Sequence, residues 1–314
     1  MKRLFYLSMV IVVFSVMTGC ASFKQDVYDL AINADRSRSD LEPGKVDIEG
    51  QTIAYLERKG DGETIVLIHG FGANKDNWIR FVRHIPEQYR VLAFDMTGHG
   101  DNSRLFEKTY NIDYITSTFA LTADAMGLEK FHIAGNSMGG YISLLYTSRN
   151  PGRVRTMCLL DTAGLIAETP YPSDLQLALE KGQSPLTPTT QEEFSELLEY
   201  AFYKKPFIPW PITSVLADKA VESGDFTKKM WKDFTTDQRD VFTILPGLDL
   251  PTLVIWGDKD RILHVSTTQV LERSLPDVET IIMKDCGHMP MLERPKETAG
   301  YYVSFLTRHT GQNE

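Results

Sequence analysis

The chain has 314 residues, of which 42% are hydrophobic and 24% are charged, a balance typical of soluble globular proteins. This balance excludes a disordered chain, a collagen-like fibre and a polytopic membrane protein. The formal net charge of −9, without any cluster of lysine and arginine, also argues against a nucleic-acid-binding protein, because phosphate binding requires clustered cations. At this length we expect one large domain, or one domain with an insertion.

The first twenty residues have the pattern of an export signal. Two basic residues precede the apolar run 4–16, and small residues then lead to Cys20. A cysteine directly after a glycine resembles a bacterial lipoprotein box, in which the signal peptide 1–19 is removed and the Cys20 thiol is lipidated. Ala21, in place of an aspartate, resembles the pattern for sorting to the outer membrane. We therefore expect an exported protein with a lipid anchor in the outer membrane, at its periplasmic or surface face. The alternative is an ordinary signal peptide or a short anchor helix.

The segment 20–44 is polar and charged, and it predicts a tether with at most one short helix. Two cysteines remain beyond it. Cys158 lies within an apolar run and Cys286 within a predicted loop, so both are expected to be free thiols.

From Lys45 onward, short apolar runs alternate with amphipathic stretches. Residues 46–56 have the alternation and central turn of a hairpin. The runs 64–69 and 90–95 are predicted as buried strands, and the runs predicted as further strands are 130–134, 154–161, 252–256 and 279–283. The stretches predicted as helices are 77–85, 113–126, 138–148, 265–275 and 296–308. This alternation predicts an α/β fold with a mostly parallel eight-stranded sheet, helices on both faces and an antiparallel edge.

Residues 165–245 interrupt this alternation. The segment is rich in proline, and its helical stretches, such as 190–203, have no buried strands between them. We expect a helical cap inserted after the sixth strand, which divides the core into 45–164 and 246–314. Apolar side chains of the cap would suit an apolar acyl chain, although each could simply pack the cap onto the core. They are Tyr200, Phe202, Tyr203, Phe207, Ile208, Trp210 and Ile212.

A nucleophile-elbow motif follows the predicted strand 130–134. Gly135-Asn-Ser-Met-Gly-Gly140 has the form G-x-S-x-G and opens a predicted helix. Bulky side chains two residues before or after the serine would block so tight a turn, which accounts for Gly135 and Gly139. The helix N-terminus behind Ser137 favours developing negative charge. The motif predicts Ser137 as a nucleophile, with a structural turn serine as the alternative.

A serine nucleophile needs a base, and the base needs an acid that orients it. Among the seven histidines, His288 lies in a glycine-containing loop after the last predicted strand, where the base belongs in this chain order. The acid is expected in Trp256-Gly-Asp-Lys-Asp260, and we favour Asp260 because two residues are needed to turn the chain back over the sheet. Asp161, which closes the sixth strand, and Asp258 are the rivals.

The same chemistry needs two backbone donors for an oxyanion. One is the N–H of Met138, directly after the nucleophile. The loop His69-Gly-Phe-Gly72 after the third strand would supply the other from Phe71, and its glycines let the backbone approach a substrate. A phosphate-binding loop would need a different glycine spacing. The sequence has no metal-binding motif, and we expect neither a metal nor a cofactor.

Taken together, these motifs resemble the α/β-hydrolases. Four of them, His69-Gly-Phe-Gly-Ala-Asn-Lys-Asp-Asn-Trp78, Gly135-Asn-Ser-Met-Gly-Gly140, Trp256-Gly-Asp-Lys-Asp260 and Gly287-His-Met-Pro290, resemble the cold-active bacterial lipases often grouped as family V. The resemblance covers about residues 45–310. It implies an exported enzyme that acts on triacylglycerols and shorter acyl esters. The elbow motif alone is shared with carbon–carbon bond hydrolases of aromatic degradation.

The sequence therefore predicts a serine carboxylic-ester hydrolase, a lipase or esterase, that works through an acyl-enzyme. Its partners would be an acyl-ester substrate and the membrane that holds the lipid on Cys20. A carbon–carbon hydrolase and a polyester depolymerase are alternatives of the same fold, but both would be expected inside the cell, against the export signal. A non-catalytic binding protein would usually have lost one of the three catalytic residues.

Overall fold

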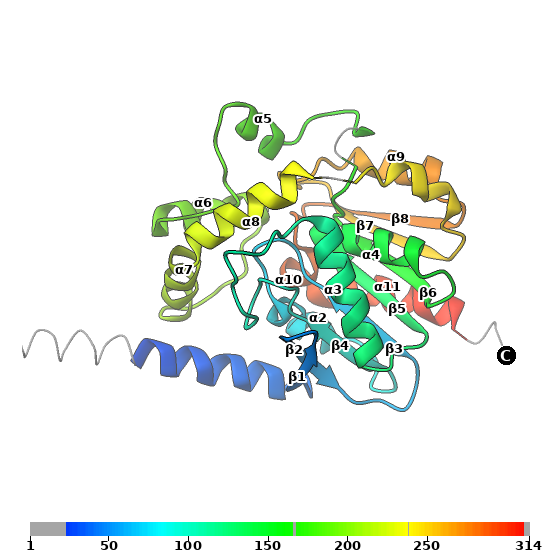
Figure 1. Cartoon of the computed structure of the whole chain (residues 1–314), viewed down its shortest axis with the longest axis horizontal. Helices are drawn as coiled ribbons and strands as arrows, with labels where there is room; N and C mark the ends of the chain where they lie inside the picture. Colours follow the sequence, from blue (N-terminus) through cyan, green and yellow to red (C-terminus); the bar gives the residue numbers. More distant parts are fainter. Residues whose placement is uncertain (1–22, 166–167, 238, 311–314) are drawn as a thin grey trace, which may run out of the picture.

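The computed structural model describes residues 23–165, 168–237 and 239–310 (Figure 1). The predicted signal peptide 1–19 and the predicted lipidation site Cys20 lie outside these residues. Among the described residues, no helix combines the length and apolar character needed to cross a membrane.

The core is an eight-stranded sheet, as predicted. The strands lie in the order β1-β2-β4-β3-β5-β6-β7-β8, with β1 and β2 antiparallel to their neighbours and the others parallel. Strands β3 to β7 are almost wholly buried, because helices cover both faces, and this explains their continuous apolar sequences. The strands are β1 Glu42–Ile48, β2 Gln51–Arg58, β3 Thr64–Ile68, β4 Arg90–Phe94, β5 Phe131–Asn136, β6 Val154–Leu160, β7 Thr252–Gly257 and β8 Val278–Met283.

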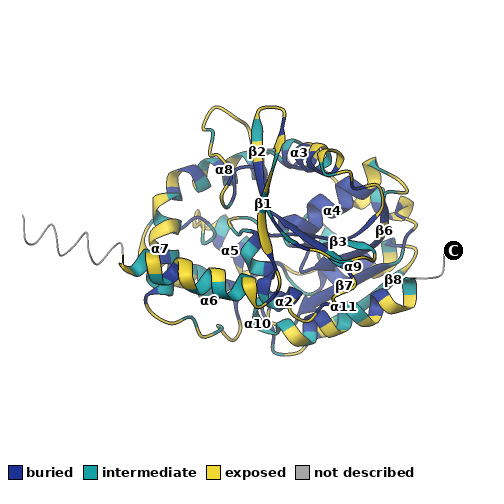
Figure 2. Cartoon of the chain, turned by 90° about the horizontal axis from the view of Figure 1, so that it is seen from below, coloured by how far each residue is buried: buried dark blue, intermediate teal, exposed yellow. Residues whose placement is uncertain are grey.

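Two hydrophobic layers hold helices against the sheet (Figure 2). Helices α3, α4 and α9 share one layer with the cap, and α2, α10 and α11 pack in the other. The helices of the core are α2 Ile79–Val82, α3 Ile112–Ala125, α4 Met138–Arg149, α9 Thr267–Ser274, α10 Pro290–Glu293 and α11 Pro295–His309.

The prediction of one continuous helix over 77–85 is wrong. A 3-10 helix, η1 Lys75–Trp78, comes first, and α2 is only one turn long. The Asn74 side chain accepts a hydrogen bond from the N–H of Asp76 and so starts the helical turn earlier than the apolar periodicity suggested. Pro86 disfavours helical geometry in the residue before it, so the segment ends short of that position.

The segment expected to be a tether is more ordered than predicted. Residues 23–37 form a single long helix, and β1 begins at Glu42. Arg36 donates two hydrogen bonds of 2.8 Å to Asp76, and the Tyr28 ring is buried beneath the ammonium group of Lys219, 4.0 Å away. This helix therefore packs on the core and on the cap.

The insertion after β6 is helical, as predicted. It lies beside the sheet and above the N-terminal helix in Figure 1. Its elements are α5 Asp174–Glu180, α6 Gln191–Ala201, α7 Ile212–Glu222, α8 Gly224–Thr236 and the 3-10 helix η3 Phe242–Gly247. The Thr190 side chain caps α6 by accepting a hydrogen bond from the N–H of Glu193.

Candidate active site

Ser137 lies on a sharp turn between β5 and α4. Its backbone has φ 56° and ψ −117°, a conformation that side-chain-bearing residues rarely adopt. A Cβ atom on Gly135 would lie 2.2 Å from the carbonyl oxygen of Gly139, and one on Gly139 would lie 2.2 Å from that of Ile68. The turn therefore requires glycine on both sides of Ser137, as the elbow motif indicated.

His288 and Asp260 meet at the same edge of the sheet. The distance from His288 Nδ1 to Asp260 Oδ2 is 2.8 Å, and both side chains are buried. The other carboxylate oxygen of Asp260 accepts hydrogen bonds from the N–H groups of Ile262, at 2.8 Å, and Leu263, at 3.0 Å. Three donors thus fix the carboxylate of Asp260, which in turn orients the imidazole ring.

Asn136, which sequence reasoning did not select, joins the nucleophile turn to the histidine loop. Its side-chain amide donates to the carbonyl oxygens of Leu160, at 3.1 Å, and His288, at 3.0 Å. It occupies the variable position of G-x-S-x-G, so the motif gave no signal for it. Ser137 and His288 line one pocket, but no hydrogen bond joins their side chains among the described residues. Such bonds often tighten only when substrate binds.

The two rival acids have other contacts. Asp258 accepts a hydrogen bond of 2.7 Å from the N–H of Asp285, which lies in the loop after β8. Asp161 is fully buried at the end of β6, where Oδ1 accepts a hydrogen bond of 2.9 Å from the N–H of Gly257. Among the three aspartates, Asp260 has the hydrogen bond to His288.

The two expected oxyanion donors lie beside Ser137. A Cβ atom on Gly70 would be 3.2 Å from the Cβ of Ser137, which shows how closely the loop after β3 approaches the nucleophile turn. Within the described residues, the N–H groups of Phe71 and Met138 have no backbone partner. The Phe71 ring packs against Trp231 of α8, with ring centroids 5.0 Å apart, and thereby ties the loop to the cap.

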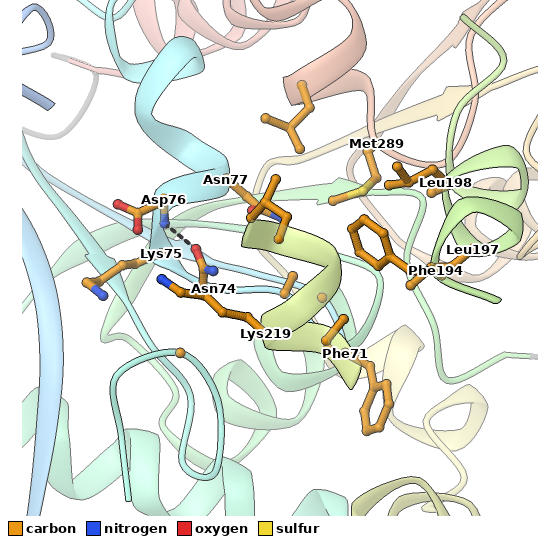
Figure 3. A pocket seen from close by; sticks show the side chains of 18 of the residues that line it. Phe71, Asn74, Lys75, Asp76, Asn77, Phe194, Leu197, Leu198, Lys219 and Met289 are labelled. Atoms are coloured by element: carbon orange, nitrogen blue, oxygen red, sulfur yellow. Dashed lines mark hydrogen bonds between the residues drawn. The ribbon is translucent and has the colours of Figure 1, made fainter. Parts of the chain in front are cut away.

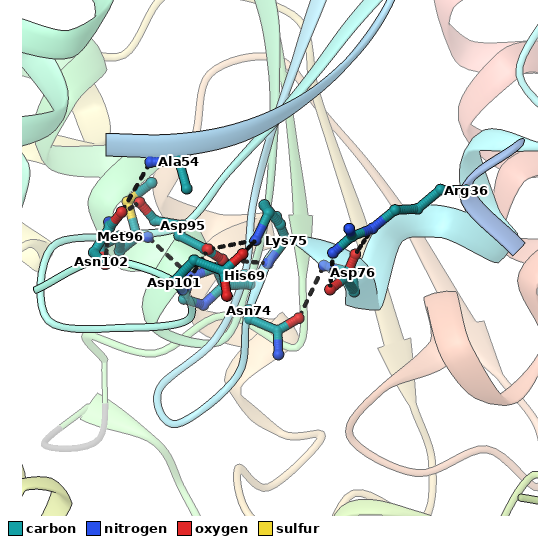
Figure 4. A network of polar contacts seen from close by, with 10 residues as sticks. All are labelled: Arg36, Ala54, His69, Asn74, Lys75, Asp76, Asp95, Met96, Asp101 and Asn102. Atoms are coloured by element: carbon teal, nitrogen blue, oxygen red, sulfur yellow. Dashed lines mark hydrogen bonds and ion pairs between the residues drawn. The ribbon is translucent and has the colours of Figure 1, made fainter. Parts of the chain in front are cut away.

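A largely buried polar network fixes the loop after β3 (Figure 4). Lys75 donates to the carboxylates of Asp95, at 2.7 Å, and Asp101, at 2.6 Å, and thereby links the loops after β3 and β4. His69 Nε2 accepts a hydrogen bond from the N–H of Met96, so the ring proton lies on Nδ1, which donates to the Gly70 carbonyl. Burial lowers the pKa of His69 to about 4, which keeps the ring neutral.

The pocket that contains Ser137 and His288 has a volume of about 560 Å³ and two chemically different ends. The cap and the loop after β8 supply an apolar end, with Phe194, Leu197, Leu198, Phe202 and Met289. The N-terminal helix, α7 and the loops after β3 and β4 supply a polar end, with Asp29, Asn33, Arg36, Asn74, Asp101, Arg104 and Lys219. Figure 3 shows labelled members of the two groups on opposite sides of the pocket. Ile208 also lines the pocket, whereas Phe207 and Trp210 are exposed.

Both predicted thiols are free and buried. Burial raises the pKa of Cys286 well above its ordinary value, and the pKa of Cys158 likewise. A thiol that resists ionisation is a poor nucleophile, so Cys286 does not compete with Ser137 despite its position two residues before His288.

Known proteins that are similar to this chain share one fold family. The family described as alpha/beta hydrolase fold matches residues 63–295. Lipase 3 of Moraxella sp. (strain TA144) is 33% identical over 300 residues, which are 92% of this chain and 93% of that lipase. Lipase 1 of Psychrobacter immobilis is 32% identical over 300 residues, which again are 92% of this chain and 93% of that lipase. The crystal structure of a membrane phospholipase A, a bacterial virulence factor, has a TM-score of 0.91 at 36% identity, covering 99% of this chain and 100% of that one. The chain therefore belongs to the α/β-hydrolase family and resembles its lipases.

Proposed function

We propose that this protein hydrolyses carboxylic esters of lipids by an acyl-enzyme mechanism. Ser137 attacks the ester carbonyl while His288 takes the serine proton, and Asp260 orients the imidazole and stabilises its cation. The N–H groups of Phe71 and Met138 hold the oxyanion. His288 then returns the proton to the leaving alcohol, and a water molecule releases the fatty acid by the same steps in reverse order.

The pocket with two ends is the observation that carries this proposal. Ser137 and His288 line it together with the apolar side chains of the cap, so an ester can place its acyl chain among those side chains and its carbonyl beside the serine. The names of the similar lipases support the same class of substrate. Triacylglycerols and shorter acyl esters are the substrates that we propose first.

Glycerophospholipids are a second candidate, favoured by the polar end of the pocket. Arg104 and Lys219 line that end, and neither forms an ion pair within the described part of the chain. Cations placed there would attract a phosphate on the leaving group. The similarity to a membrane phospholipase A supports the same substrate class.

We also propose that a lipid on Cys20 anchors the enzyme to the outer membrane. The basic residues, apolar run and small residues before Cys20 support this. Incorporation of a labelled fatty acid into the full-length chain, and its loss in Cys20→Ala, is the expected result; equal labelling of both chains would contradict the anchor.

A fluorophosphonate probe on the full-length chain in detergent tests the nucleophile. We expect labelling of the wild type and none of Ser137→Ala, whose ester hydrolysis should fall by about 10⁴-fold or more. Ser148→Ala is the matched control, because Ser148 is exposed on the same helix α4. A wild type that resists the probe would favour a binding protein instead.

Substrate series separate the remaining alternatives. Hydrolysis of p-nitrophenyl esters of increasing chain length distinguishes a lipase from a short-chain esterase. A carbon–carbon hydrolase or a polyester depolymerase would leave these esters largely intact and would turn over a vinylogous diketone or a polyhydroxyalkanoate film.

A further inference from the structure

A second carboxyl group lies next to the proposed acid Asp260. Polar side-chain atoms of Asp161, Asp260 and His288 all lie within 4.8 Å of one another, and all three residues are buried. Asp161 sits directly after β6 at φ 45°, where its N–H donates to the Ile255 carbonyl and its Oδ1 accepts from the N–H of Gly257. The backbone thus fixes this side chain against the site.

The second oxygen of Asp161 lacks a partner. Asp161 Oδ2 is buried and has no hydrogen bond within the described residues. A buried polar atom without a partner is costly, and two carboxylate oxygens can form a hydrogen bond only if one carries a proton. The titratable groups around Asp161 include Asp260, Cys286, His288 and Glu293, and the carboxyl groups of Asp260 and Glu293 disfavour a second anion there.

The two carboxyl groups differ in the donors that they receive. Asp260 accepts from the imidazole of His288 and from two backbone N–H groups, whereas Asp161 accepts from a single N–H. Hydrogen bonds to a carboxylate favour its charged form, so the donors favour a proton on Asp161 over one on Asp260. Burial and the negative charge of Asp260 both raise the pKa of Asp161 well above its ordinary range.

We propose that Asp161 stays protonated at neutral pH and donates its proton in a hydrogen bond to the Asp260 carboxylate. Asp161 is then a positioning residue, the outermost member of a chain that continues through Asp260 and His288 to Ser137. This inference rests on the proposed function. By sharing the negative charge of Asp260, the Asp161 hydroxyl weakens the hold of Asp260 on an imidazolium. The imidazole therefore keeps its neutral form, which can accept the serine proton, down to a lower pH.

Two substitutions in the full-length enzyme test this assignment through the pH dependence of kcat/KM. Asp161→Asn keeps a donor toward Asp260, so we expect near-wild-type activity and an acid limb displaced by less than about 0.3 pH unit. Asp161→Leu keeps the branched shape and avoids Cβ branching at a positive φ, but it removes the donor, so the acid limb should move to higher pH. An ionised Asp161 predicts the opposite sign, with both variants lowering the acid limb by about 1 pH unit or more.

Asp260→Asn provides the matched comparison. It should lower kcat by about 10⁴-fold, because an amide at that position holds the wrong imidazole tautomer. If Asp161→Asn is the variant that loses activity while Asp260→Asn retains it, the acid is Asp161 and the proposal is overturned.

Two further measurements do not depend on catalysis. The infrared spectrum at pH 8 should contain the carbonyl stretch of a protonated carboxyl group that is absent from Asp161→Asn. In reversible denaturation, the unfolding constant of the wild type relative to Asp161→Asn should rise about tenfold per pH unit above about pH 4, because the unfolded Asp161 ionises and the folded one does not. If the ratio of unfolding constants does not depend on pH, or if the infrared spectra are identical, Asp161 carries no proton and the inference fails, even if the enzyme hydrolyses esters as proposed. If both measurements give the expected result but the enzyme does not hydrolyse esters, Asp161 is protonated as proposed and only the proposed function is refuted.

Discussion

The edge of the sheet that carries the proposed catalytic residues and the wall of the pocket are held in place by different means. At the edge, strand ends and tight turns position Ser137, Asp260 and His288, and backbone groups fix most of the contacts. In the wall, side chains hold the N-terminal helix in place: Arg36 pairs with Asp76 of the core, and Tyr28 packs with Lys219 of the cap. The edge thus has little freedom to vary, whereas the wall can change with single side chains.

This difference assigns separate tasks to the two regions. The reaction depends on geometry that only particular backbone conformations allow, so changes at the edge should affect every ester. In the proposed function the wall contacts the two ends of the substrate, so changes there should alter the choice of substrate and spare the chemistry. The predictions below test this division.

The largest effect is expected from Gly135→Ala. The new Cβ would lie 2.2 Å from the Gly139 carbonyl oxygen, so the turn that presents Ser137 must move. We expect kcat/KM to fall at least about 100-fold for all esters, since small displacements of reacting groups are this costly. Gly300→Ala in α11 is the control, because nothing lies within 4 Å of its added Cβ. Near-wild-type activity of Gly135→Ala would show that the edge tolerates change.

Lys75→Met should cause the next largest effect, on stability. Lys75 is 2% exposed and Asp95 is fully buried, so the substitution leaves a buried carboxylate without its cation. We expect the free energy of unfolding in urea to fall by about 3–5 kcal/mol. Lys259→Met is the control, because its ion pair with Asp258 lies in solvent-exposed surface and should have no measurable effect. Equal stabilities of the two variants would show that the network does not stabilise the loop after β3.

Arg36→Ala should have a smaller effect that depends on the substrate. It breaks the hydrogen bonds to Asp76 that hold the N-terminal helix against the pocket. We expect KM for glycerides to rise about threefold to tenfold, because a looser wall must be ordered on binding, while methyl esters are hydrolysed as before. Arg38→Ala is the control, since the side chain of Arg38 is 68% exposed. Equal losses of activity on glycerides and on methyl esters would show that the helix is needed for the reaction itself.

The smallest effect is expected from the polar end of the pocket. Arg104→Glu should lower kcat/KM for anionic phospholipids about threefold, through charge repulsion, and leave triacylglycerols unchanged. Lys232→Glu, at an exposed position of α8, is the control for general loss of positive charge. The loss of activity on phospholipids should also be smaller at high salt, because exposed charges are screened. A loss shared by both substrates would argue against a phosphate at this end.

The fold and the three residues proposed for catalysis were predictable because they depend on local sequence. Continuous apolar runs predict strands buried on both faces, and the glycines around Ser137 predict a turn that few other residues allow. The order of the strands then predicts which loops meet at the carboxyl edge of a parallel sheet. The separation of Asp260 from His288 by 28 residues was no obstacle, because both follow neighbouring strands.

Contacts between distant side chains, by contrast, were decided only by the tertiary structure. Composition indicated a polar tether, yet the helix 23–37 became a wall of the pocket because Arg36 and Tyr28 find partners that lie in η1 and α7. Asn136 occupies a position that its motif leaves open, and Asp161 looked like a rival to Asp260 until folding placed both carboxyl groups together. A sequence pattern reports local preference, whereas burial, charge and proton sharing depend on neighbours that only the folded chain supplies.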